Sequence, residues 1–169
     1  MHIRRLTPAD AAAFQEFRLA ALQESPTAFG SSYEEERDFS QAFIEDRLAA
    51  RSDRGPFGAF EGAELVGLIA LGRERQRKLE HKALIWGMYV LPKARGNGIG
   101  RTLLLSALEL ARSVLGIRQV NLCVNANNRT AINLYKSVGF EVFGHERGAM
   151  LVDGELHDEL HMCLHLSGG

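Results

Sequence analysis

The 169-residue sequence is poor in cysteine, nearly neutral in net charge and free of long apolar runs. Its two cysteines, Cys123 and Cys163, are too few for a disulfide framework. The formal net charge of −1 gives no overall attraction to nucleic acid or to an anionic membrane, so any anion site must be local. No apolar run approaches the ~18 residues of a membrane span, and the first residues lack the apolar stretch of a secretory signal. These absences predict a cytoplasmic protein with neither nucleic acid nor membrane as a partner.

The spacing of apolar residues predicts a single α/β domain over residues 1–169. Helices are expected to begin at Pro8, Ser40, Ile99 and Asn128, because each start has a capping or dipole signal or follows glycines. The segment 27–39 is typical of a loop or a loosely helical lid. Strands are expected at 3–6, 57–71 (a hairpin), 83–91, 119–124, 140–146 and 155–166, with a bulge at Gly87.

Three glycines, Gly96, Gly98 and Gly100, stand between the apolar strand 83–91 and the helix that begins at Ile99. Glycine leaves the backbone bare, and a helix N-terminus presents unpaired N–H groups with a partial positive charge. The segment therefore predicts a site for an anion, most often a phosphate.

The same segment lacks both common phosphate-binding motifs. A Walker A loop would require glycine five positions after Gly96, where Arg101 stands. A dinucleotide fingerprint would require its third glycine at Arg101 or at Leu103. These failures weaken a nucleotide-binding domain of another kind.

The segment does contain Arg95-x-x-Gly98-x-Gly100, and on this motif the chain resembles the GNAT superfamily of N-acetyltransferases. The apolar strand before it and the helix after it fit the family's pattern. Asn128-x-x-Ala131-x-x-x-Tyr135, followed by Gly139-Phe140, is similar to the family's second cofactor element. The resemblance implies the acyl-CoA N-acyltransferase fold, a mixed and mostly antiparallel central sheet with helices on both faces, splayed between the two central strands.

The resemblance implies acetyl-CoA as the cofactor, and no metal is expected because of the histidine spacing described below. Backbone N–H groups of the glycine segment would bind the pyrophosphate, and backbone groups of Met88 and Val90 would pair with the pantetheine arm. N–H groups of Met88 and Tyr89 are candidates for stabilising the oxyanion. The cofactor contacts that it implies are Met88, Tyr89, Val90, Arg95, Gly96, Asn97, Gly98, Ile99, Gly100, Arg101, Asn128, Ala131, Tyr135 and Lys136.

The implied reaction is direct attack of a primary amine on the thioester in a ternary complex. Tyr135 matches the family tyrosine that protonates the departing CoA thiolate. A general base is not identified, because Leu84, Ile85 and Trp86 occupy the positions where relatives place a glutamate. The alternatives are a water chain, an amine of low pKa, or one of Glu34, Glu35, Glu80 and His81.

The acceptor is expected to contact Phe29, Tyr33, Glu34 and Trp86. Its identity should be set by the segment "AFGSSYEEE", which resembles bacterial members that act on small amines, by the charged loop before Ala83 and by the last two strands with their turn "MLVDGEL". Glu34, Glu35 and Glu36 would suit a cationic amine, although acidic residues on a loop are more often solvated. A small amine, amino acid or antibiotic is the first choice and a protein lysine or N-terminus the second. A non-catalytic CoA-binding sensor, a homodimer formed by the late strands and the acyl-chain preference all stay open.

Two further patterns have simpler interpretations. His161-x-Cys163-x-His165 lies on one strand face, but alternate residues are about 6.6–6.8 Å apart, so the outer histidines are too distant to share one metal ion. The basic run 73–78 lacks interleaved aromatic residues and indicates a solvated connection.

Overall fold

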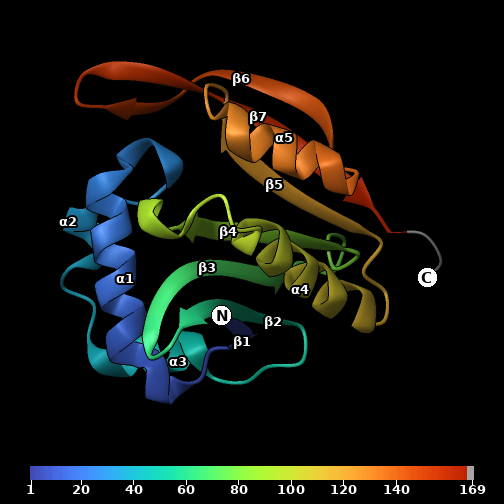
Figure 1. The fold of residues 1–169 in the computed structure, drawn as a ribbon. Helices are drawn as coiled ribbons and strands as arrows, with labels where there is room; N and C mark the ends of the chain where they lie inside the picture. Colours follow the sequence, from blue (N-terminus) through green and yellow to red (C-terminus); the bar gives the residue numbers. More distant parts are fainter. Residues whose placement is uncertain (167–169) are drawn as a thin grey trace.

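The computed structural model describes residues 1–166, which form a seven-stranded sheet in the order β1-β2-β3-β4-β5-β7-β6 (Figure 1). Over this part of the chain, neighbouring strands are antiparallel except for the parallel pair β4 and β5. This mixed sheet confirms the expected fold. The strands are β1 (His2–Arg5), β2 (Arg54–Glu61), β3 (Glu64–Arg73), β4 (Lys82–Val90), β5 (Gln119–Asn125), β6 (Glu141–Val152) and β7 (Glu155–His165).

Helices cover both faces of the sheet and enclose one apolar core on each face. The central strand β3 contributes residues to both cores. Leu65 and Leu68 belong to the core under α1 and α3, whereas Val66 and Ile69 belong to the core under α4. Among residues 1–166, no helix has the length and apolar character needed to cross a membrane. The helices are α1 (Ala11–Glu24), α2 (Tyr33–Glu36), α3 (Gln41–Leu48), α4 (Ile99–Ser113) and α5 (Arg129–Val138), with 3-10 turns η1 (Pro8–Asp10), η2 (Pro26–Ala28) and η3 (Pro92–Ala94).

The two late strands form a hairpin that is longer than the sequence pattern predicts. β6 continues to Val152 instead of ending at residue 146, and it pairs with β7 up to Val152 opposite Glu155. Asp153 and Gly154 close the turn with φ values of 50° and 81°. The extension, residues 147–152, ends in four apolar residues in succession, so it lacks the alternation of apolar and polar positions that predicts a strand.

β4 and β5 pair over only three residues and then separate. The pairs are Lys82 with Gln119, Ala83 with Val120 and Leu84 with Asn121. Beyond Leu84, the β5-facing backbone groups of β4 are therefore outside the sheet ladder. Gly87, at φ +64°, lies in a bulge where the register between β3 and β4 shifts, which confirms the expected position. This opening between the central strands is where the candidate site lies.

Candidate functional site

A cavity of about 450 Å³ lies at the N-termini of α4 and α5, beside the end of β4. Its lining includes most of the residues expected to contact a cofactor: Met88, Tyr89, Val90, Arg95, Gly96, Gly98, Ile99, Gly100, Arg101, Asn128 and Ala131. Asn97 and Lys136 are exposed and are not among the lining residues. The glycine segment and the second motif thus meet in one place, although 30 or so residues separate them along the chain.

The glycine segment has the backbone geometry of an anion cradle. Gly96 and Gly98 have φ values of 82° and 76°, and within the described chain no heavy atom lies within 4 Å of a Cβ built on either residue. The first helical hydrogen bond runs from the Thr102 N–H to the Gly98 carbonyl at 3.1 Å. The N–H groups of the preceding helical residues thus lack intrahelical acceptors and are available to an anion.

Two arginines and one asparagine border this cradle. Arg95 donates from Nε to the Val90 carbonyl at 2.9 Å, and Arg101 donates from Nη1 to Ser137 Oγ at 3.1 Å. Both guanidinium groups therefore lie beside the cavity, where they can donate to phosphate oxygens, and Nη2 of Arg95 also lies 3.9 Å from Glu24. Asn128 Oδ1 accepts a hydrogen bond from the Ala131 N–H at 3.1 Å, which confirms its expected role as the cap of α5.

Tyr135 lines a second, smaller cavity of about 90 Å³ between β4 and β5. This cavity shares Met88, Asn128 and Leu134 with the larger one, so the two adjoin. Tyr135 is only 5% exposed, and burial raises the pKa of its hydroxyl. The phenol therefore keeps its proton at neutral pH, as a general acid requires.

The four proposed bases lie outside this opening. Glu80 and His81 precede β4, at the end where β4 and β5 are still paired. Glu34 and Glu35 belong to α2, and Glu35 accepts hydrogen bonds from the backbone and side chain of Ser32 in a capping box. None of the four is among the residues that line the cavity of Tyr135.

A thiol that has no predicted role is among the residues that line the opening. Cys123 is exposed, and its Sγ lies 3.2 Å from Nδ1 of His161, whose Nε2 lies 2.8 Å from Glu146. Partial burial of the sulfur beneath its neighbours, followed by the charges of Glu159 and Glu146, raises the pKa of the Cys123 thiol. Cys123 faces His161 only because β5 pairs with β7, and no local sequence signal reports that pairing.

The position of Cys123 predicts its reactivity. We expect iodoacetamide to label Cys123 more slowly than a free thiol at neutral pH, with a rate that increases as the pH rises, because the raised pKa keeps the sulfur protonated. Saturating acetyl-CoA should slow labelling several-fold further, since Cys123 lines the opening beside Met88. Peptide mass spectrometry measures both effects, with the buried Cys163 as the internal reference. If acetyl-CoA did not change the labelling rate of Cys123, the acetyl end of the cofactor would not lie in this opening.

The residues expected to contact the acceptor divide between two places. Phe29, Tyr33 and Glu34 line a groove of about 710 Å³ between the segment after α1 and the end of β6. Trp86 is half-buried on β4, beside Gly87 in the wall of the opening. The groove and the cavity of Tyr135 have no lining residue in common, so the expected acceptor contacts are divided between two separate places.

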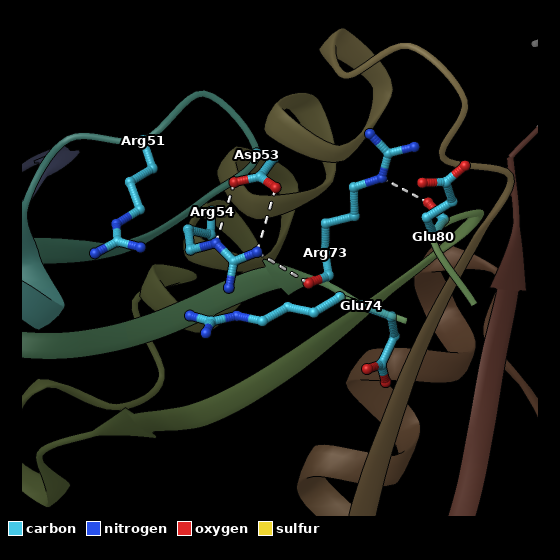
Figure 2. Close-up of a pocket in the computed structure, with 7 residues that line it drawn as sticks. Arg51, Asp53, Arg54, Arg73, Glu74 and Glu80 are labelled. Atoms are coloured by element: carbon cyan, nitrogen blue, oxygen red, sulfur yellow. Dashed lines mark hydrogen bonds and ion pairs between the residues drawn. The ribbon is translucent and has the colours of Figure 1, made fainter. Parts of the chain in front are cut away.

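A polar pocket lies where β2 begins and β3 ends (Figure 2), and the charged residues that line it form hydrogen bonds and ion pairs with one another. Arg54 forms an ion pair with Asp53 at 3.1 Å and donates to the Arg73 carbonyl at 3.2 Å. Arg73 in turn donates to the Glu80 carbonyl at 2.6 Å. These bonds, which also lower the pKa of Asp53, join the strand ends and explain the cluster structurally.

Comparisons with known proteins agree with this geometry. Residues 18–140 match the Acetyltransferase (GNAT) family, so the chain belongs to that family, and the resemblance on Arg95-x-x-Gly98-x-Gly100 is confirmed. The acetyltransferase of the GNAT family from Streptococcus pneumoniae superposes with a TM-score of 0.87 at 22% identity, covering 98% of this chain and 99% of that one. The yncA structure from Salmonella typhimurium, solved with acetyl-CoA, superposes with a TM-score of 0.82 at 23% identity, covering 100% and 95%.

Relatives by sequence are named for different acceptors. The chain is 26% identical over 119 residues to the L-amino acid N-acetyltransferase AaaT of Escherichia coli, covering 70% of this chain and 73% of that one. It is 28% identical over 100 residues to the spermidine N(1)-acetyltransferase of Vibrio cholerae, covering 59% of this chain and only 56% of that protein. Family membership therefore leaves the acceptor to be inferred from the site.

Proposed function

We propose that this protein transfers the acetyl group of acetyl-CoA to the primary amine of a small molecule, by direct attack in a ternary complex. One observation carries the proposal: the glycine cradle at the start of α4 opens into a cavity that adjoins the buried Tyr135 between the separated strands β4 and β5. An anion site, a free strand edge and a protonated phenol thus lie in sequence along one passage.

Each part of the passage has a binding or catalytic task. The backbone N–H groups from Gly96 to Gly100, with Arg95 and Arg101, would hold the phosphates. The free backbone groups of β4 at Met88 and Val90 would pair with the amide groups of the pantetheine arm, as an added strand does. When bound, acetyl-CoA supplies the activated thioester whose oxygen becomes negative as the amine attacks, and N–H groups at Met88 and Tyr89 would stabilise that charge.

Tyr135 would donate its proton to the departing thiolate. Its burial keeps the phenol neutral, and its place in the wall of the opening sets it beside Met88. A carboxylate base on β4 is replaced by Leu84, Ile85 and Trp86, so the amine would lose its proton to water before attack.

A second candidate function is acetylation of a protein N-terminus. The groove beside Tyr33 lies between the segment after α1 and the end of β6, where a peptide would be able to contact both. The chain is also 39% identical over 98 residues to the N-alpha-acetyltransferase RimI of Mycobacterium tuberculosis, covering 57% of this chain and 58% of that one. A homodimer through the late strands and a cytoplasmic location stay predictions.

Thermal unfolding with acetyl-CoA, CoA, ATP and NAD side by side tests the cofactor. A ligand at 100 times its Kd adds about 2.7 kcal/mol of stability, so we expect acetyl-CoA and CoA to raise the melting temperature and ATP and NAD to leave it unchanged. A larger shift with ATP or NAD, or none with CoA, would contradict the proposal. Release of CoA thiol in the presence of amines then separates an enzyme from a CoA-binding sensor, which would bind without turnover.

A further inference from the structure

Arg18 of α1 is a buried cation with one nitrogen left unpaired. Its residue is 4% exposed, and it forms an ion pair with Glu36 through Nε at 2.9 Å and Nη2 at 2.8 Å. Nη2 also donates to Ser31 Oγ at 3.0 Å. In the described part of the chain, Nη1 of Arg18 is buried and has no hydrogen-bond partner. A buried charged donor without an acceptor is costly, so this nitrogen calls for an explanation.

The unpaired nitrogen is directed at the bulge of β4. Nη1 lies 3.4 Å from the position that a Cβ on Gly87 would occupy, and the guanidinium carbon lies 6.0 Å from the ring centre of Trp86. Met88, the next residue along, has its side chain near Gly100 instead. The two residues of the bulge therefore face opposite sides, with the glycine cradle on one side and Arg18 on the other.

A second cation, Arg47 of α3, lies on the same side. Its guanidinium carbon is 5.0 Å from the ring centre of Trp86 and within 6 Å of the rings of Phe39 and Phe43. The ion pairs formed within residues 1–166 leave Arg47 without a carboxylate partner. Burial lowers its pKa, which shows that its charge is already partly removed from water.

The acidic segment of α2 does not supply the missing negative charge. Glu36 is 3% exposed and is neutralised by Arg18, while Glu35 is engaged in the capping box with Ser32. Two guanidinium groups therefore lie near Trp86 with only one carboxylate between them, and that of Arg18 lies closer still to the ring of Phe29, at 4.6 Å. Glu35 and Glu36 are therefore already engaged within the protein and do not favour a cationic acceptor.

We propose that the acceptor carries an anionic group as well as its amine, and that Arg18 and Arg47 bind this group over the face of Trp86. The most economical ligand is the carboxylate of an α-amino acid, because guanidinium forks match planar carboxylates in two parallel hydrogen bonds. The anion would accept from the free nitrogen of Arg18, and the neighbouring amine would then lie at Gly87, in the wall of the opening. A polyamine would instead place cations beside two arginines.

This inference rests on the proposed acetyl transfer, and matched acceptors test it. CoA thiol release would be measured for leucine, leucinamide and isoamylamine, for phenylalanine, its amide and phenethylamine, and for spermidine. We expect kcat/KM for the carboxylate-bearing member to exceed that of its decarboxylated amine by about 10- to 100-fold, the range of one charge-assisted pair. Equal or better turnover of the decarboxylated amines or spermidine, or no turnover of any carboxylate-bearing amine, overturns the inference.

Variants locate the effect. Arg47→Met keeps the apolar stem and should raise KM for the amino acid about 10- to 100-fold while leaving that for the amide and the Kd for acetyl-CoA unchanged. Arg37→Met is the matched control, since Arg37 is a half-exposed arginine paired with Asp38. Arg18→Met alone would leave the buried carboxylate of Glu36 without its ion-pair partner, so Arg18 is tested in the double variant R18M/E36Q. If the unmodified protein did not bind acetyl-CoA, the proposed function would be wrong. If it bound acetyl-CoA but showed no preference for carboxylate-bearing amines, only this inference would be wrong.

Discussion

Replacing Tyr135 with phenylalanine is expected to lower kcat by about 100- to 10,000-fold, the usual contribution of a positioned general acid. The substitution removes one oxygen atom and keeps the ring that packs against Phe140 at a centroid distance of 5.9 Å. The Kd for acetyl-CoA should stay within about twofold, because Tyr135 lines the opening and not the glycine cradle. Steady-state thiol release and ligand-induced melting shifts measure the two quantities.

The alkaline stability of the same variant provides an independent check. Burial raises the pKa of Tyr135 in the folded state above the ordinary value near ~10, so the unfolded chain loses this proton first as the pH rises. The stabilising effect is complete below pH ~10 and is lost above it, and Y135F should lose less stability over that range. A variant with wild-type kcat and the expected alkaline behaviour would show a buried tyrosine whose role is packing alone.

Replacing Gly98 with alanine is expected to weaken acetyl-CoA binding by about 10- to 100-fold, the loss of one or two charge-assisted hydrogen bonds. The added methyl group would project into the space beside the free N–H groups of α4, where the phosphates are proposed to lie. The backbone at φ +76° is also strained for alanine, at a cost of about 1–2 kcal/mol in unfolding free energy.

Gly62→Ala is the matched control for that strain. Gly62 has φ +61° in the turn between β2 and β3, and no described heavy atom lies within 4 Å of its Cβ position. The two variants should lose similar stability in urea unfolding, while only Gly98→Ala raises the Kd for acetyl-CoA. If both variants had the same Kd for acetyl-CoA, the phosphates would not bind at the glycine cradle.

The features that the sequence predicts correctly are those encoded by neighbours along the chain. The glycines before Ile99, the Asn128 cap and the bulge at Gly87 each depend on local backbone conformation, and each is found where expected. The separation of β4 from β5 was expected from the family resemblance and not from any local pattern.

The features that the sequence does not predict depend on packing between distant segments. Arg18 and Glu36 are 18 positions apart and lie on different helices, so nothing in either helix pattern indicates their ion pair. Cys123 alternates with the buried residues of β5 and so lies on the exposed face, but its contact with His161 depends on the pairing of β5 with β7. In both cases, the tertiary arrangement decides which charge or thiol is available to a ligand.

The short ladder between β4 and β5 also has a mechanical consequence. Three residue pairs join the half of the sheet made by β1 to β4 to the half made by β5, β7 and β6, so this seam is the shortest ladder among the described strands. A ligand that forms hydrogen bonds to β4 while contacting α5 would bridge the seam. Part of its binding free energy would then hold the two halves of the sheet together.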